Sequence, residues 1–579
     1  MQSIEMQKEL LMSGVSFCFR NVNFPIEYSR FLCLLRTSSG QLTGNEMKFE
    51  DLVINHLGEF GRYQKLQFFL VCLPSMFTAM HALSWTFSAA NVPHRCRLPG
   101  ELENSNYWTN DTRLLTKNCD AATRCPYDEC KLADGRDCPN GFIYDRSEIT
   151  FSAIDRWDIV CDSSVLKAVI QSTYYIGQMI GSLVFGYLGD LIGRKKVFVV
   201  AIGLQIISGL GMVVAPHWSV FGILRAGVGF AHPGIFVIAV VIGMELVGPS
   251  KRKIASVFTG IFFSFGQMTL GILAYYIRDY QYLQLAIAAP ALVFLSYWWL
   301  VPESARWLVS QRRYADADAI IQRAAKFNRT TVPAKWWESL EDEQQNDGSR
   351  PKAKIFDLLR TPKIRKISLS IFFCWPVVSM VYYGVSMNTS FLGGDLYQTF
   401  IFGALMEVPA VLTVFFLIDR IGRKALLAGG FTIASLCMLS NLFIGDNVHW
   451  LLSMAQFLIA KASITATYAS IYTFTPELFP TIIRNTAMGF CSMMARVGAI
   501  AASYISMWLV DKYGKEAMII PFASLGLCAA IVIIAMLPET MGKNLAETID
   551  EIEGKVRSHE LEPLNASSTT NTATATKTE

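Results

Sequence analysis

Three ionisable side chains interrupt otherwise apolar stretches in the second half of this 579-residue chain, namely Glu407, Lys461 and Arg496. Ionisable groups inside a membrane are costly, and where they occur they usually serve a function. A carboxylate can bind an organic ammonium ion, whereas a guanidinium offers five N–H donors that match a carboxylate. One fixed anion and two fixed cations therefore indicate a site for a small charged solute.

Aromatic residues accompany these charges. Trp375 and Tyr382 stand seven positions apart, so in a helix both rings lie on one face. An aromatic face attracts a quaternary ammonium group by cation–π contact, worth up to about 2 kcal/mol when the pair is desolvated. We predict that both rings line the site, and ordinary core packing is the alternative for each of them.

The composition supplies a membrane scaffold for these residues. Hydrophobic residues make up 52% of the chain and charged residues 17%, against about 25% charged in a typical soluble protein. The mean hydropathy is +0.33. Twelve segments approach or exceed the roughly 20 apolar residues that cross a bilayer. We predict spans at 66–88, 167–188, 197–215, 219–243, 254–276, 281–301, 366–387, 396–418, 425–444, 449–473, 486–510 and 516–537.

The net charge of +4 is unevenly distributed along the chain. Lys and Arg gather at 194–196, 251–253, 420–424 and in the 302–366 loop, whereas the short connectors on the other side hold few. Basic loops stay in the cytosol, so we expect both termini and the long loop to be cytoplasmic. Each basic patch flanks a span, which argues against nucleic-acid binding. Met47 resembles a second start.

Six cysteines lie in the predicted outer loop, residues 89–166: Cys96, Cys119, Cys125, Cys130, Cys138 and Cys161. We predict disulfides because this loop should face an oxidising exterior, and six cysteines allow fifteen pairings. A zinc site with His94 is the alternative, but no paired C-x2-C spacing supports it. Asn110 is a candidate glycan acceptor, whereas Asn328 and Asn565 should lie on the cytosolic side and stay unmodified.

Three signatures recur in order at a nearly constant offset. GDLIGRKK at 189–196 returns as IDRIGRKA at 418–425, 229 positions later. The Glu/Arg pairs at 245/252 and 477/484 stand 232 apart, and VPES and LPET end at residues 304 and 540. Such repetition indicates an internal duplication. We therefore predict an all-α membrane protein of twelve transmembrane helices in two parallel six-helix halves, which resembles the major facilitator fold.

The same pattern sets the expected domain boundaries. We predict a cytoplasmic N-terminal segment at 1–65 and a first six-helix half with the extracellular loop at 66–301. A cytoplasmic loop of short amphipathic helices follows at 302–365, a second half at 366–537, and a cytoplasmic tail with a disordered end at 538–579.

The repeated basic motifs predict a cytoplasmic gate. Its residues are Asp190, Gly193, Arg194, Glu245 and Arg252 in the first half, and Asp419, Gly422, Arg423, Glu477 and Arg484 in the second. The glycines permit tight turns, and the ion pairs should form when the cytosolic side is closed and break when it opens. The alternative is that the cations only mark topology. Gly177, Gly181 and Gly186 should permit close helix approach.

Several of these motifs resemble one known family. GEFGRYQK at 58–65, the six-cysteine loop, PESARWLVSQRR at 302–313, GALMEVPA at 403–410 and ELFPTIIRN at 477–485 are similar to the organic cation, carnitine and organic anion transporters, solute-carrier family 22. The resemblance runs from about residue 47 to 545. It implies alternating access and broad specificity for small organic ions.

The resemblance also suggests site residues. Phe263 and Tyr468 match pocket positions of that family, and Arg496 stands where its cation branch carries aspartate and its carnitine-like and anion branches carry arginine. Phe236 and Val240 depart from the cation branch, and Val411 stands where many anion members have lysine. Together with Glu407, Lys461, Trp375 and Tyr382 these residues suit a zwitterion such as carnitine or a betaine. An ion pair of Arg496 with Glu407 is the structural alternative.

We therefore predict a polyspecific secondary transporter of small organic cations or zwitterions in the plasma membrane, with an organic anion exchanger as the alternative. No H-E-x-x-H, G-x-S-x-G, G-x4-G-K-[ST] or G-x-G-x-x-G motif is present, so we expect no enzyme, cofactor or metal. A sensor that has lost transport would keep the fold but should damage the gate motifs. The coupling ion, sodium or proton, and self-association through the outer loop are left open.

Overall fold

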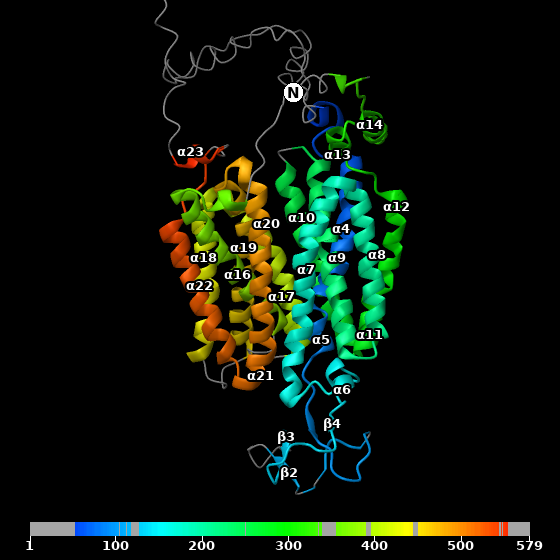
Figure 1. Ribbon diagram of the computed structural model, residues 1–579, viewed down its shortest axis with the longest axis vertical. Coiled ribbons are helices and arrows are strands. Elements are labelled where there is room, and N and C mark those ends of the chain that lie inside the picture. Colours follow the sequence, from blue (N-terminus) through cyan, green and yellow to red (C-terminus); the bar gives the residue numbers. More distant parts are fainter. Residues whose placement is uncertain are drawn as a thin grey trace, which may run out of the picture. The chain divides into compact units, whose positions relative to one another are not determined.

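The structure is a computed structural model, shown in Figure 1. It describes residues 52–553 except 104, 110, 112, 117–126, 249–250, 334, 339–354, 389–394, 444–449, 544–545 and 547, and it leaves out the side chains of 115, 116, 252, 253, 255, 256 and 355. Predictions about residues 1–46, Asn110, Cys119, Cys125, the Arg252 side chain and the end of the tail, residues 554–579, lie outside the described residues. All elements below belong to one compact unit, Phe49–Ala334 with Asp347–Glu579.

Helices make up most of the described part of this unit. We call the first set the N-half: α4 (Arg62–Leu83), α5 (Trp85–Ser88), α7 (Val165–Ile192), α8 (Arg194–Val213), α9 (Trp218–Leu246), α10 (Arg252–Tyr276), α11 (Tyr280–Ala288), η4 (Pro290–Ser296) and α12 (Tyr297–Leu300). The C-half contains α16 (Pro362–Met387), α17 (Leu396–Ile421), α18 (Arg423–Phe443), α19 (Trp450–Leu478), α20 (Thr481–Tyr504), η7 (Ile505–Leu509), α21 (Val510–Tyr513) and α22 (Glu516–Met536).

Eleven stretches of the described chain are long and apolar enough to cross a membrane. They coincide with eleven of the predicted spans. The twelfth predicted span, at 449–473, corresponds to α19, which is less apolar than the other eleven. Its buried residues include several polar ones, among them Lys461, Thr465, Thr467, Ser470 and Thr475. Since α19 packs against α17 and α18, its polar side chains lie inside the bundle.

Two helices begin earlier than the hydropathy pattern predicts. The third and ninth spans were expected from 197 and 425, but α8 starts at Arg194 and α18 at Arg423. Gly193 and Gly422 precede them with φ of 106° and 100°, a backbone conformation that residues with a Cβ adopt at a cost. The cations therefore belong to the first turns of these helices rather than to free loops.

Glycines allow α7 and α9 to approach closely, as predicted for two of three positions. A Cβ at Gly177 would lie 2.1 Å from the carbonyl oxygen of Ala226, and one at Gly181 would lie 2.1 Å from that of Phe230. The prediction for Gly186 was wrong, because nothing lies within 4 Å of a Cβ placed there.

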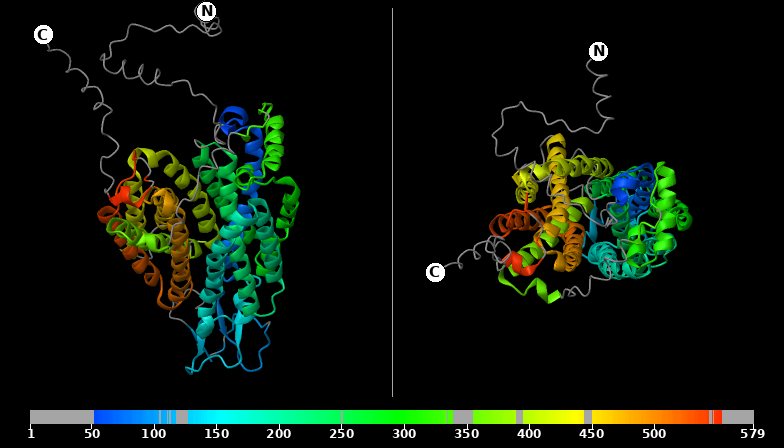
Figure 2. Two further views of the ribbon diagram at one scale, coloured as in Figure 1. Left: turned by 45° about the horizontal axis from the view of Figure 1, so that its top comes forward. Right: turned by 90° about the horizontal axis from the view of Figure 1, so that it is seen from above.

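The two halves meet along two pairs of helices, α10 with α17 and α7 with α20. Figure 2 shows the halves side by side, the N-half in blue to green and the C-half in yellow to red. The long connecting loop contains two short helices, α13 (Ala305–Ser310) and α14 (Tyr314–Asn328), as the sequence predicted. These helices lie at the same end of the bundle as α23 (Ile549–Glu553).

A small disulfide-bonded region occupies the other end, which we call the loop end (Figure 1). Strand β1 (His94–Cys96) pairs antiparallel with β4 (Phe142–Tyr144), and β2 (Leu114–Thr116) pairs with β3 (Tyr127–Leu132). Helix α6 (Ala153–Trp157) leads from this region toward α7.

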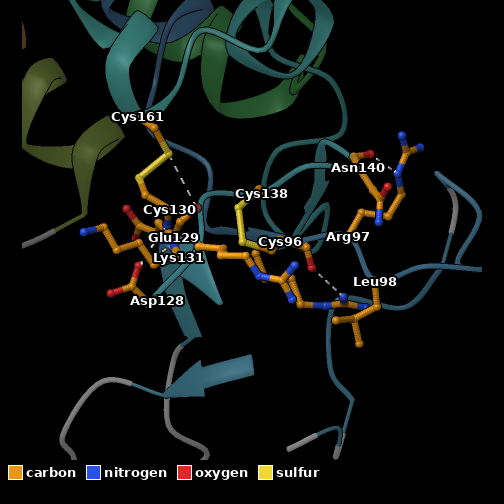
Figure 3. Close-up of a disulfide and its surroundings, with 12 residues drawn as sticks. Cys96, Arg97, Leu98, Asp128, Glu129, Cys130, Lys131, Cys138, Asn140 and Cys161 are labelled. Carbon is orange, nitrogen blue, oxygen red and sulfur yellow. Dashed lines mark hydrogen bonds between the residues drawn. A yellow bond between two sulfur atoms is a disulfide. The ribbon is translucent and has the colours of Figure 1, made fainter. Parts of the chain in front are cut away.

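Two disulfides hold this region together, as Figure 3 shows: Cys96–Cys138 and Cys130–Cys161. They confirm the predicted disulfides for four of the six cysteines. A ring nitrogen of His94 lies within 4.8 Å of the sulfur atoms of Cys130 and Cys161. Because those two sulfurs are joined to each other, neither is a thiolate ligand for a metal.

Candidate functional site

The Glu407 carboxylate is the centre of a buried polar network. It pairs with Lys461 Nζ at 2.7 Å and accepts a hydrogen bond from the Tyr382 hydroxyl at 2.9 Å. Two donors come from α10 in the other half: Gln267 Nε2 at 2.7 Å and the Ser264 hydroxyl at 3.1 Å. Glu407 therefore connects three helices of the C-half with one helix of the N-half.

Lys461 shares this environment. Its ammonium lies 4.1 Å from the centre of the Tyr382 ring and also donates to the Ser386 hydroxyl. The side chains of Lys461 and Glu407 are each 3% exposed. Because a buried charge must be paired, these two residues neutralise each other and Glu407 is not a bare anion.

Arg496 lies apart from this ion pair. Its side chain projects from α20 and is buried among Tyr383, Tyr468 and Tyr472, and Tyr174 and His232 of the N-half also lie near it. Among the described residues no carboxylate forms a salt bridge with it, and its Nε has no hydrogen-bond partner. The proposed alternative, an ion pair between Arg496 and Glu407, is not what the structure shows.

Three of the four predicted aromatic residues, Trp375, Tyr382 and Tyr468, lie together beside these charges. Tyr382 and Tyr468 stack with ring centres 5.2 Å apart and planes 12° apart. Trp375 contacts Tyr468 at 6.3 Å and Tyr472 at 4.6 Å, and its indole N–H donates to Thr475. Trp375 and Tyr382 thus share one face of α16, as their spacing predicted.

Phe263 lies in a second aromatic group, on the N-half side. Its ring contacts Phe236 at 5.5 Å and His232 at 6.3 Å, and His232 shares a 2.6 Å hydrogen bond with the Tyr174 hydroxyl. Since Phe263 precedes Ser264 in α10, it lies next to the Glu407 network in sequence. Its role in binding stays a prediction.

The N-half gate cluster is formed at the end opposite the loop end. Arg194 pairs with Asp190 at 2.7 Å and with Glu245 at 3.4 Å, so it joins the end of α7 to the end of α9. A Cβ on Gly193 would lie 2.3 Å from a carboxylate oxygen of Glu303, so a side chain there would displace this carboxylate. The ion pairs are those expected from the motif.

The C-half gate cluster repeats this geometry. Arg423 pairs with Asp419 at 2.8 Å and with Glu477 at 3.0 Å. Arg484 instead donates to the backbone oxygen of Phe479. Asp190, Arg194 and Glu245 all belong to the N-half, and Asp419, Arg423 and Glu477 all belong to the C-half, so neither cluster bridges the halves.

Two carboxylates in these clusters were missed as site residues. Glu303 accepts from the backbone N–H of Lys195, and Glu539 accepts from those of Arg423 and Lys424. Each therefore caps a helix that starts with cations, where a negative charge also favours the helix dipole. The repeated VPES and LPET motifs contained the signal, since their glutamates recur at nearly the same offset as the basic motifs.

Glu539 makes a pH-dependent contribution to stability. Burial alone would raise the pKa of Glu539, but hydrogen bonds from the backbone N–H groups of Met541, Lys424, Arg423 and Thr540 outweigh it and lower the pKa. A carboxyl group whose pKa is lower in the folded protein than in the unfolded chain stabilises the fold at pH values above its unfolded-state pKa. This stabilisation is lost as the pH falls through the folded-state pKa.

We therefore expect Glu539→Gln to destabilise the protein by about 0.5–2 kcal/mol at pH 7, the usual range for a lost helix cap. The difference from the parent should narrow below about pH 4.3, the usual pKa of glutamate. Thermal unfolding of the purified protein at a series of pH values measures this. A difference that stays constant over the series would contradict the assignment.

Gln267 and Ser264 were also missed. They stand three positions apart in α10, and so they share the helix face that meets α17. The polar residues of an apolar span were the available signal, but hydropathy does not say which polar residue meets which charge.

Comparison with known proteins agrees with this architecture. Residues 114–552, more than half of the chain, match the family described as "Sugar (and other) transporter". Among solved structures, a partially occluded inward-open conformation of the xylose transporter XylE from E. coli is similar with a TM-score of 0.59 and 16% identity, covering 83% of this chain and 100% of that one. At this identity the likeness shows the fold alone, which is the major facilitator fold.

Curated relatives are more similar in sequence. The chain is 38% identical over 527 residues to "Organic cation transporter protein" of Drosophila melanogaster, covering 88% of this chain and 95% of the relative. It is 32% identical to "Solute carrier family 22 member 4" of Mus musculus (88% and 96%) and 30% identical to "Organic cation/carnitine transporter 2" of Homo sapiens (87% and 94%).

The chain therefore belongs to the sugar (and other) transporter family and, within it, to solute-carrier family 22. This confirms the resemblance noted in the sequence. It makes the protein a multi-pass membrane transporter of organic ions and not an enzyme.

Proposed function

We propose that this protein moves small zwitterions and organic cations, of the carnitine or betaine type, by alternating access of a site around Arg496, Glu407 and the Tyr382–Tyr468 stack. One observation carries the proposal: Arg496 is 5% exposed and, among the described residues, pairs with no carboxylate, whereas Glu407 is already paired with Lys461. A buried guanidinium without a protein carboxylate suits a substrate carboxylate.

The aromatic rings suit the other end of such a substrate. The Tyr382–Tyr468 stack and Trp375 lie on the same side of the C-half as Arg496, which is surrounded by Tyr468 and Tyr472. A trimethylammonium group is held by ring faces rather than by hydrogen bonds, because it has no N–H donor. A carboxylate on Arg496 and an ammonium group against the rings thus match both ends of a zwitterion.

An organic anion is the second candidate substrate. The three fixed charges of the site, Glu407, Lys461 and Arg496, sum to one positive charge, which favours a monoanion over a bare cation. The names of the relatives and the aromatic rings favour a substrate that also carries an ammonium group.

We place the protein in the plasma membrane with both termini in the cytoplasm. The basic segments lie at the end of α13, α14 and the gate clusters, and the disulfides support an outward-facing loop end. The gate clusters would then stabilise the cytoplasmic end during the transport cycle.

Side-by-side uptake tests the substrate class. Cells expressing the full chain are given labelled carnitine, tetraethylammonium or benzoate, with surface expression measured in the same cells. We expect carnitine to enter fastest. Preference for tetraethylammonium would assign Arg496 a structural role, and preference for benzoate would favour the anion exchanger. Uptake of none of the three, at normal surface expression, would contradict the proposal.

A further inference from the structure

A cavity lies between the halves, at the loop end. Its volume is about 380 Å³, and its lining includes Asn91, Lys167, Asp395, Met507 and Asp511. In Figure 1 its neighbours α5 and α21 lie at the end of the helical bundle that faces the disulfide-bonded strands. None of these residues belongs to the site around Arg496.

One ion pair crosses the halves in this cavity. Lys167 at the start of α7 pairs with Asp511 of α21 at 2.9 Å, and Asn91 contacts both, donating to Asp511 at 3.0 Å and accepting from Lys167. Among the described residues this is the ion pair that connects the N-half with the C-half. It therefore has to break before the halves can separate at the loop end.

The burial of the pair limits what can break it. The Lys167 side chain is 9% exposed and that of Asp511 is 25% exposed. A cation that captured Asp511 would leave the Lys167 ammonium buried without its carboxylate, and an anion that captured Lys167 would leave Asp511 unpaired. Removing one partner of a buried pair is costly. A ligand with both charges satisfies both residues.

The remaining charges of the cavity favour the same ligand. Glu148 and Asp395 also line it, so its acidic side chains outnumber the basic Lys167. An excess of negative charge attracts the ammonium end of an approaching solute. Met387 and Met507 supply adaptable apolar surface for its methyl groups.

We infer that this cavity is a separate outer binding site for a zwitterion, which inserts its ammonium group at Asp511 and its carboxylate at Lys167 and thereby opens the loop end. The ligand class rests on the proposed function, and the site would receive the substrate before it reaches Arg496. A ligand that carries only one charge satisfies one partner and leaves the other unpaired, so it binds here more weakly and opens the ion pair less readily.

Chemical labelling tests this without measuring transport. Met507→Cys places a thiol in the cavity wall, and the purified full-length protein in lipid nanodiscs is treated with a maleimide, with the parent chain as background. Glycine betaine at ten times its Kd should slow labelling about tenfold. Tetramethylammonium and acetate at the same concentration should not. Equal protection by all three, or by none, would overturn the inference.

Two further sets of variants separate this site from the central one. In the Arg496→Ala background the protection by betaine should persist, and its loss would assign the effect to the central site. Lys167→Gln and Asp511→Asn should each abolish protection by betaine, whereas the exchanged pair Lys167→Asp with Asp511→Lys should restore it. Protection unchanged in the single variants would overturn the inference. Failed uptake with intact protection would reject the proposed function alone.

Discussion

Arg496→Ala lowers kcat/KM for carnitine uptake about 10- to 150-fold, while uptake of tetraethylammonium changes little. Hydrogen bonds to a charged group contribute about 1.5–3 kcal/mol, and each 1.4 kcal/mol corresponds to a factor of ten. The carboxylate of carnitine loses this interaction, whereas tetraethylammonium has no carboxylate to lose. The measurement is initial uptake of both solutes over a range of concentrations, normalised to the transporter at the cell surface.

Arg496→Lys is the matched control for charge. It keeps the positive charge but not the two-pronged donor geometry, so the loss for carnitine should be intermediate. Arg496→Asp should move the preference toward plain cations. If all three variants lowered the uptake of both solutes by the same factor, Arg496 would hold the tyrosines in place and would not contact the substrate.

Glu407→Gln destabilises the protein by about 3–5 kcal/mol, the usual cost of leaving a buried charge without its partner. Lys461 would keep the Ser386 hydroxyl, the Tyr382 ring and a neutral amide oxygen, but no negative charge among its described contacts. Lys461→Met should cost less, because Glu407 would keep three donors: Tyr382, Gln267 and Ser264. Thermal unfolding of the purified variants measures which of the two substitutions destabilises the protein more.

The double variant Glu407→Gln with Lys461→Met distinguishes a pair from two independent residues. Removing both charges removes the unpaired charge, so the double variant should be more stable than Glu407→Gln alone. Additive losses would show that the two side chains do not compensate each other. Gln398→Glu, at the exposed start of α17, is a control for charge change on the same helix.

Much of the fold could be predicted because its signals are local. An apolar segment must satisfy its backbone hydrogen bonds internally in a bilayer, so a run of about 20 apolar residues becomes a helix whatever its neighbours are. The hydropathy signal was weakest for the span around Lys461, because the polar residues of this helix face the protein interior rather than lipid. The helix starts at Arg194 and Arg423 were missed because glycine conformation and a distant glutamate set them.

The candidate site was predicted less completely. The sequence singled out Glu407, Lys461 and Arg496, and the structure shows which two of them pair. The sequence could not reveal Gln267 or Ser264 as partners of Glu407. Nor could it reveal Asp511 as the partner of Lys167, 344 positions away. Nothing in the residue types distinguishes these contacts from the many others that the same residues could make.

The amino-acid sequence by itself therefore determined the spans, the duplicated halves, the oxidised loop and the residues that could carry charge into the bundle. Each of these follows from composition or repetition along the chain. Only the tertiary structure decided that Glu407 is neutralised by Lys461, that Arg496 keeps no carboxylate among the described residues, and that Lys167 joins the halves through Asp511. Ion pairing acts over a few ångströms, and distances of that size between remote helices are set by packing.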